Sequence, residues 1–131
     1  MALPRHPRID VNLGYHKACA DGRASIVKLL LHHPSCGAKL SVWSASLHGH
    51  TAVLKWIIAS GKDVDFHERH EDYEWYDEEG RTAIEISRKK GKIETVSLLE
   101  HFQSDPNQTR QAIRQELGVA GGRFSFFFFL F

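Results

Sequence analysis

One pattern occurs three times along this chain, and it constrains the fold more than any other feature. In each copy a short segment rich in small residues ends in a glycine, and a run of mostly aliphatic residues follows. The glycines are Gly22, Gly49 and Gly91, which stand 27 and 42 residues apart. Repeats of this length are typical of chains in which each unit buries its apolar surface against its neighbours. The pattern therefore predicts a stack of similar units joined by loops of unequal length.

Each copy is typical of a helical hairpin. Glycine tolerates the left-handed backbone conformation that ends a helix, so the chain can reverse at each of these glycines and enter a second helix. In the first two copies the apolar residues after the glycine recur at helical spacing, and they form a face too wide for one hairpin to bury. We therefore expect neighbouring hairpins to bury this face for one another. Its residues are Ile26, Val27, Leu29, Leu30 and Leu31, then Val53, Leu54, Trp56, Ile57 and Ile58.

The three copies resemble the ankyrin repeat, whose pattern runs roughly TPLHxAxxxGHxxIVxxLL over about 33 residues. The resemblance covers residues 8–102. It implies an all-α, ankyrin-type helical-repeat solenoid, in which antiparallel helix pairs stack, short β-hairpin or loop fingers protrude, and the first helices line a concave face. The matching residues are His16, Ala18, Gly22, Ile26, Val27, Leu29 and Leu30; Ala45, Gly49, His50, Val53, Leu54, Ile57 and Ile58; and Thr82, Ile84, Gly91, Ile93, Val96, Leu98 and Leu99.

A further helix is expected after the third copy. Asp105 suits the N-cap position, Pro106 the first helical position and Gln108 the third, as in a capping box. Only one narrow face of this helix is apolar, so we expect a terminal cap whose remaining surface, Arg110 and Arg114 included, is solvated. The expected plan is an ankyrin-repeat domain at 1–119, with repeats at about 13–33, 40–60 and 81–102, a finger insertion at 63–80, a cap helix at 106–117, and a disordered or aberrant apolar tail at 120–131.

The copies depart from the ankyrin pattern in ways that carry their own expectations. The first and third copies lack the consensus TPLH sequence, so their first helices are expected to begin less tightly capped. The connection at 35–41 is about six residues short, and its hairpin is expected to be lost or reduced to a turn. The resemblance gives His16 a structural role, in which its ring ties the helix start by hydrogen bonds.

The finger insertion is strongly acidic. Residues 63–80 contain nine acids and one arginine, a net charge of −8, so a chain of net charge +1 keeps +9 on its other residues. One interpretation is that this acidic finger docks a basic partner segment by charge steering and aromatic anchoring. The other is that its aromatic residues cover the stack and its acids face the basic residues 88–92. The candidate partner-binding residues here are Glu71, Asp72, Tyr73, Trp75 and Tyr76.

No motif for a reaction or a metal is present. Asp63 and Asp65 begin like a calcium loop, but Glu68 stands where that loop needs glycine. The closest histidine pairs lack a cysteine pair at zinc-site spacing, and nucleophile-elbow and phosphate-loop patterns are absent. We therefore expect no enzyme activity, no cofactor and no metal. Two cysteines and no secretory h-region favour the cytoplasm or nucleus over secretion.

These expectations lead to a functional hypothesis. The chain is predicted to be a non-catalytic protein-interaction module that binds a partner protein, with no nucleic acid, membrane or small-molecule substrate. The alternative is a terminal fragment of a longer ankyrin-repeat protein without autonomous activity, because the chain opens in mid-repeat. From the resemblance, the concave face carries Lys17, Asp21, Ser44, Leu47, His48, Glu85, Arg88 and Lys89.

Overall fold

The computed structural model describes residues 11–32, 39–65, 70–72 and 77–119. Over these residues the chain is mostly helical, with seven helices and four short strands. The prediction of a mainly helical architecture is thus confirmed. The apolar tail at 120–131 and the aromatic residues 73, 75 and 76 of the finger lie outside the described part of the chain.

Six of the helices form three hairpins, which we call layers 1, 2 and 3. Within each hairpin the turn glycine has a φ of 70–72°, where a side chain would be strained. The residue after the glycine donates its backbone N–H to a carbonyl of the first helix, at 2.8–2.9 Å in all three layers, and so closes that helix. The layers are α1 (Val11–Asp21) with α2 (Ala24–Leu31), α3 (Trp43–His48) with α4 (Thr51–Ala59), and α5 (Ala83–Lys89) with α6 (Ile93–Ser104).

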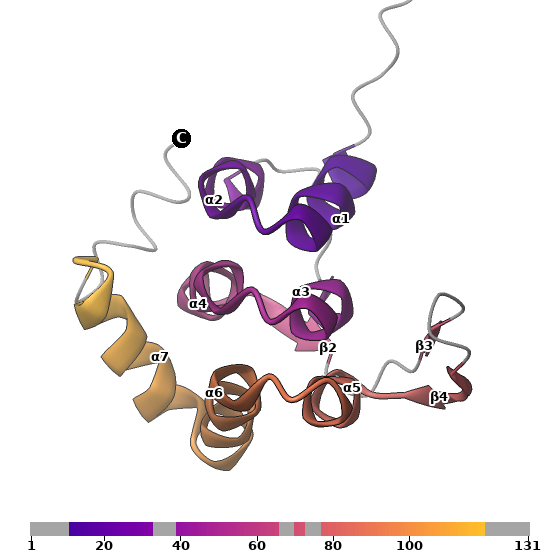
Figure 1. Ribbon diagram of the computed structural model, residues 1–131. Coiled ribbons are helices and arrows are strands. Elements are labelled where there is room, and N and C mark those ends of the chain that lie inside the picture. Colours follow the sequence, from indigo (N-terminus) through magenta and orange to yellow (C-terminus); the bar gives the residue numbers. More distant parts are fainter. Residues whose placement is uncertain (1–10, 33–38, 66–69, 73–76, 120–131) are drawn as a thin grey trace, which may run out of the picture.

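The layers stack in chain order. The first helices α1, α3 and α5 lie side by side, and the second helices α2, α4 and α6 form a parallel row beside them (Figure 1). We call the side of each layer that faces toward layer 1 its upper face, and the opposite side its lower face. The middle layer is therefore covered on both faces.

Burial along the second helices follows this stacking. In layer 2 the residues four, five, eight and nine positions after the glycine are all buried, and they are Val53, Leu54, Ile57 and Ile58. In layer 1 only the fifth and ninth positions are buried, Val27 and Leu31; in layer 3 only the fourth and eighth are, Thr95 and Leu99. The fourth and eighth positions therefore belong to the upper face, and the fifth and ninth to the lower face.

Two short strand pairs connect the layers. β1 (Lys39–Ser41) pairs in parallel with β2 (Asp63–Asp65), so the loop before layer 2 is tied to the loop after it. β3 (His70–Asp72) pairs antiparallel with β4 (Asp77–Arg81), which leads into α5. The connection at 35–41 was expected to lose its hairpin. Its described end is instead a strand whose partner comes from the next loop.

The last helix, α7 (Pro106–Glu116), begins as the sequence predicts, because the Gln108 backbone N–H donates to Oδ1 of Asp105 at 3.1 Å. Its path is different from that of a further layer. It runs across the outer side of the second helices and contacts both α6 and α4 (Figure 1). A single α7 residue, Ile113, is buried there.

Candidate interaction surface

The eight residues predicted for the concave face lie on the three adjacent first helices. Lys17 and Asp21 are on α1, the residues at 44, 47 and 48 are on α3, and those at 85, 88 and 89 are on α5. Five of the side chains are exposed, namely Lys17, Asp21, His48, Arg88 and Lys89, whereas Ser44, Leu47 and Glu85 are half-buried. We call this set the first-helix face. Its exposed charges are mainly basic.

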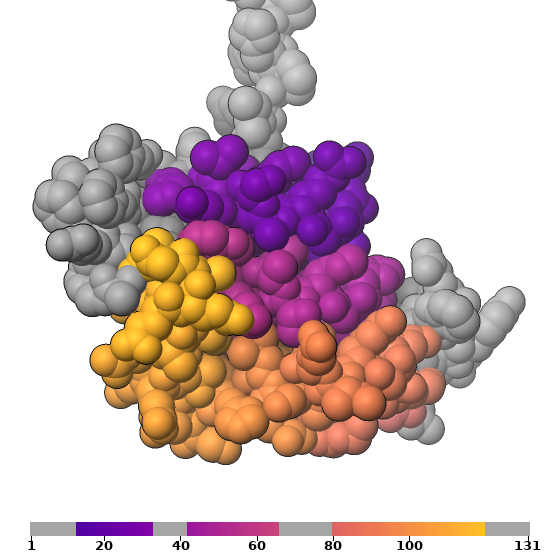
Figure 2. Space-filling view, turned by 60° about the vertical axis from the view of Figure 1, so that its left-hand side comes forward, coloured from indigo at the N-terminus to yellow at the C-terminus, as the bar shows by residue number. Residues whose placement is uncertain are grey.

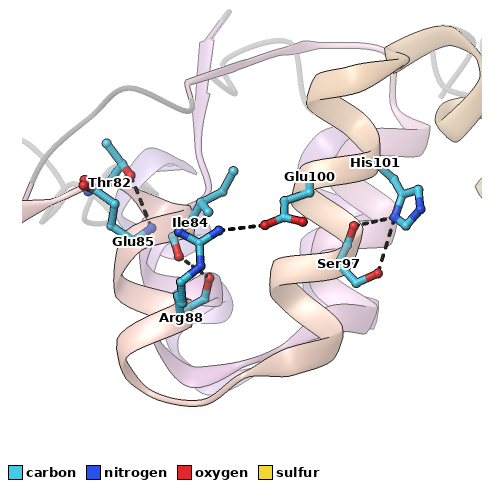
Figure 3. Close-up of polar contacts among 8 residues, drawn as sticks. Thr82, Ile84, Glu85, Arg88, Ser97, Glu100 and His101 are labelled. Carbon is cyan, nitrogen blue, oxygen red and sulfur yellow. Dashed lines mark hydrogen bonds and ion pairs between the residues drawn. The ribbon is translucent and has the colours of Figure 1, made fainter.

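Two members of the first-helix face are engaged within the chain. The carboxylate of Glu85 accepts from the Thr82 backbone N–H at 3.0 Å, and the Thr82 hydroxyl accepts from the Glu85 backbone N–H at 3.3 Å (Figure 3). The two residues form a capping box at the start of α5. The expectation that the third copy begins loosely capped is therefore wrong, because the sequence from Thr82 to Glu85 supplies this motif in place of TPLH.

Arg88 is the second engaged member. Its Nη2 donates to Oε1 of Glu100 on α6 at 2.7 Å, and both side chains are exposed to solvent (Figure 3). One interpretation of the acidic finger placed its carboxylates against Arg88. The described partner of Arg88 is the second helix of its own layer, and the side chains of the finger carboxylates at 68–79 lie outside the described residues.

A histidine does tie one layer to the next, but it is not His16. His16 is exposed, and its ring lies edge to face against Tyr15 with centroids 5.5 Å apart. A ring nitrogen of His50 lies 3.0 Å from the backbone oxygen of Ala20, at the end of α1. His48 lies beside it, with ring centroids 5.6 Å apart. This contact joins the end of α1 to layer 2, and it differs from the tie at a helix start that the resemblance gives to His16.

The base of the acidic finger is anchored to layer 2. The buried indole of Trp43 donates its Nε1–H to the Arg81 carbonyl at 2.7 Å, just where β4 enters α5. Beyond this point the β3–β4 hairpin projects from the side of the stack on which the first helices lie (Figure 1). Of the candidate finger residues, Glu71 and Asp72 are in β3, whereas Tyr73, Trp75 and Tyr76 lie outside the described residues.

A second concave surface, which the sequence did not indicate, lies on the opposite side of the stack. It is a groove of about 940 Å³ between α4, α6 and α7, and its position can be followed beside α7 in Figure 2. Ile93, with 80% of its surface exposed, stands at one end of it. Lys55, Glu94 and His101 add charge or polarity to its walls. The groove is shallow and mixed in character, and it contains no cluster of catalytic groups.

The arginines of α7 are not the solvated residues that the sequence suggested. Nε of Arg110 donates to the Ile58 carbonyl and Nε of Arg114 to the Ala59 carbonyl, each at 2.9 Å. Burial lowers the pKa of both guanidinium groups; the Asp63 carboxylate opposes this for Arg110. Because the last carbonyls of a helix lack partners within it, these two arginines complete the C-terminal end of α4.

Neither a metal site nor a membrane-spanning helix is found in the described part of the chain. No group of three histidine, cysteine or acidic side chains there could hold a metal ion, and none of the described helices combines the length and apolar character needed to cross a bilayer. No protein-family model, curated protein or solved structure matches this chain.

Proposed function

We propose that this chain is a non-catalytic protein-interaction module of the ankyrin-repeat type. It binds a partner protein through the first-helix face and the neighbouring acidic finger. The observation that carries the proposal is that three adjacent helices, from three repeated units, present exposed charged or polar side chains on the side from which the finger projects. Surfaces assembled from equivalent elements of successive repeats are the usual binding surfaces of repeat proteins.

The charges of the two parts are opposite. The first-helix face has Lys17, Arg88 and Lys89 against Asp21 and Glu85, and the finger has a net charge of −8, with histidine counted as neutral. A partner that carries an acidic segment next to a basic one would complement both parts at once. Since these charges are exposed, screening by salt should weaken the complex.

Matched variants of the full chain test this proposal. The face variant carries His48→Glu and Lys89→Glu, and the finger variant carries Glu71→Ser, Asp72→Ser, Asp77→Ser, Glu78→Ser and Glu79→Ser. The control carries Gln111→Glu and Gln115→Glu, two exposed positions of α7. Each is immobilised at equal density, and the proteins captured from lysate are quantified by mass spectrometry at low and high salt.

The expected result is at least one protein that binds the wild type and the control, and that is reduced about tenfold or more by the face variant and by the finger variant. The same set of captured proteins on all four baits would contradict the proposal.

A further inference from the structure

The two ends of the stack are made from equivalent positions, and these positions can be compared one by one. In layers 1 and 2 the lower face contains a small residue three positions before the glycine, Cys19 or Ser46, and an aliphatic residue nine positions after it, Leu31 or Ile58. All four are buried. In layer 3 the same two positions are occupied by Arg88 and Glu100, which are exposed and form an ion pair of 2.7 Å. Two of the stacking positions at the lower end are therefore charged, whereas the fifth position is the half-buried Val96.

Among the described residues, the stacking positions at the upper end of the second helix carry no charge. Its fourth and eighth positions are Ile26 and Leu30, the counterparts of Val53 and Ile57, which are fully buried beneath layer 1. Ile26 is 38% exposed and Leu30 half-buried. Layer 1 thus keeps the aliphatic residues of a layer that is covered from above, although no described element covers it.

The residue after each turn glycine is a second, independent indication that layer 1 is built to be covered from above. His50 of layer 2 packs against Gly22 of layer 1 so closely that a Cβ on that glycine would stand 2.6 Å from Nδ1 of the His50 ring. Lys92 of layer 3 packs against Gly49 of layer 2 in the same way, and a Cβ on Gly49 would be 2.7 Å from Cδ of Lys92. Each residue therefore packs against the glycine of the layer above, and the positive φ of these glycines disfavours any side chain there.

Arg23 is the equivalent residue of layer 1. Its backbone angles, φ −87° and ψ 80°, match those of His50 and Lys92, at φ −82° and −84° with ψ 75° in both. Arg23 is exposed, and its Nε is 4.0 Å from the carboxylate of Asp21. The backbone of Arg23 thus has the conformation in which His50 and Lys92 contact the glycine of the layer above. In the described residues, no layer lies above Arg23.

We infer that the upper face of layer 1 is a docking site for a helical hairpin of a separate partner protein. The hairpin would place a glycine turn above Arg23, against its side chain, and aliphatic side chains against Ile26 and Leu30. A carboxylate on its first helix would complement Lys17, which stands at the position of the buried Ile86 of layer 3. A second copy of this chain does not fit, because its lower face offers Arg88 and Glu100 at the stacking positions.

The contact can be reconstructed with a designed probe. The probe is the full chain with Arg88→Glu and Glu100→Leu, which give its lower face the required carboxylate and aliphatic residue, and with Ile26→Asp, which blocks its own upper face. Mixed with the wild type, it is expected to form a one-to-one heterodimer in sedimentation velocity at tens of micromolar. The Ile26→Asp single variant used in place of the wild type should bind the probe at least about tenfold more weakly, since a carboxylate would then be buried among aliphatic groups.

Circular dichroism and thermal unfolding establish that each variant is folded, and Arg23→Glu replaces Ile26→Asp if the latter is not. No heterodimer with the probe would overturn the inference. A heterodimer that is unaffected by Ile26→Asp and Arg23→Glu would place the contact elsewhere and would overturn it as well. Self-association of the wild type at the same concentration, abolished by Ile26→Asp, would assign the site to a second copy and would refute the partner proposed.

Discussion

Ile26 and Leu30 lie at the upper end of the stack, whereas Arg88 and Glu100 lie at its lower end. The layer 2 residues at the same four positions are all buried. An exposed aliphatic residue favours contact with another apolar surface, whereas burying an exposed ion pair costs the solvation of both charges. The two ends therefore differ in whether a further layer would stabilise them, although their backbones are built alike.

The largest expected effect compares one position across the layers. Ile57→Ala and Leu99→Ala each remove a fully buried side chain eight positions after the turn glycine, and each should lower the free energy of unfolding by about 2–5 kcal/mol. Leu30→Ala should cost less than half as much, because its site is open on one side. Urea unfolding followed by circular dichroism measures all three. Equal losses would show that Leu30 is already covered.

The next effect concerns how α7 is held. Replacing Arg110 and Arg114 together by Met keeps the aliphatic contacts and removes the donors to the Ile58 and Ala59 carbonyls. We expect a loss of about 1–3 kcal/mol in the free energy of unfolding, because the Ala59 carbonyl loses the Arg114 donor and the Ile58 carbonyl keeps only the Gly61 backbone N–H, at 3.3 Å. Gln111→Met, at an exposed position of α7, is the control and should change little. A double variant as stable as the control would mean that α7 is held by its other contacts, which include the packing of Ile113 and the Lys55–Glu116 ion pair.

A smaller effect distinguishes the covered turn from the open one. His50→Ala removes the hydrogen bond to the Ala20 carbonyl and the contact with Gly22. It should lower the free energy of unfolding by about 0.5–1.5 kcal/mol. Arg23→Ala removes an exposed side chain and should remain within about 0.5 kcal/mol of the wild type. Thermal unfolding of the two variants side by side gives the comparison, and similar losses would mean that Arg23 has a structural contact of its own.

The smallest effect is the ion pair at the lower end. A double-mutant cycle with Arg88→Ala and Glu100→Ala should give a coupling of about 0.2–1 kcal/mol, because both side chains are exposed. The coupling should decrease as salt is added. A coupling that exceeds this range and persists in high salt would indicate that the pair is a stabilising element rather than a polar end to the stack.

Much of the helical plan is readable from the sequence, because the features that fix it are local. The turn glycines, the aliphatic spacing of α2 and α4, and the cap at Asp105 act within a few residues of chain. The same is true of Thr82 and Glu85. Their capping box corresponds to a local T-x-x-E pattern in the sequence, which differs from the TPLH sequence of the ankyrin consensus at this position.

The features that the sequence did not predict depend on distant partners. Arg110 and Arg114 are typical of a solvated face until α7 lies across α4, and nothing near them in the sequence indicates that helix. β1 and β2 have three residues each, too few for a periodic pattern, and their pairing joins two different loops. His48 and Lys89 could be placed on adjacent helices only through the resemblance.

The position of α7 also bears on the order in which the molecule folds. Each layer stacks on one that is adjacent in the chain. Equivalent positions of successive layers are 27 and 42 residues apart. The bonds from Arg110 and Arg114 to α4 join residues 52 and 55 positions apart. Closing a longer loop costs more chain entropy before any contact repays it, and contacts of high sequence separation slow folding. We therefore expect the layers to form first and α7 to dock last, with folding φ-values near zero for Arg110 and substantial for Val53.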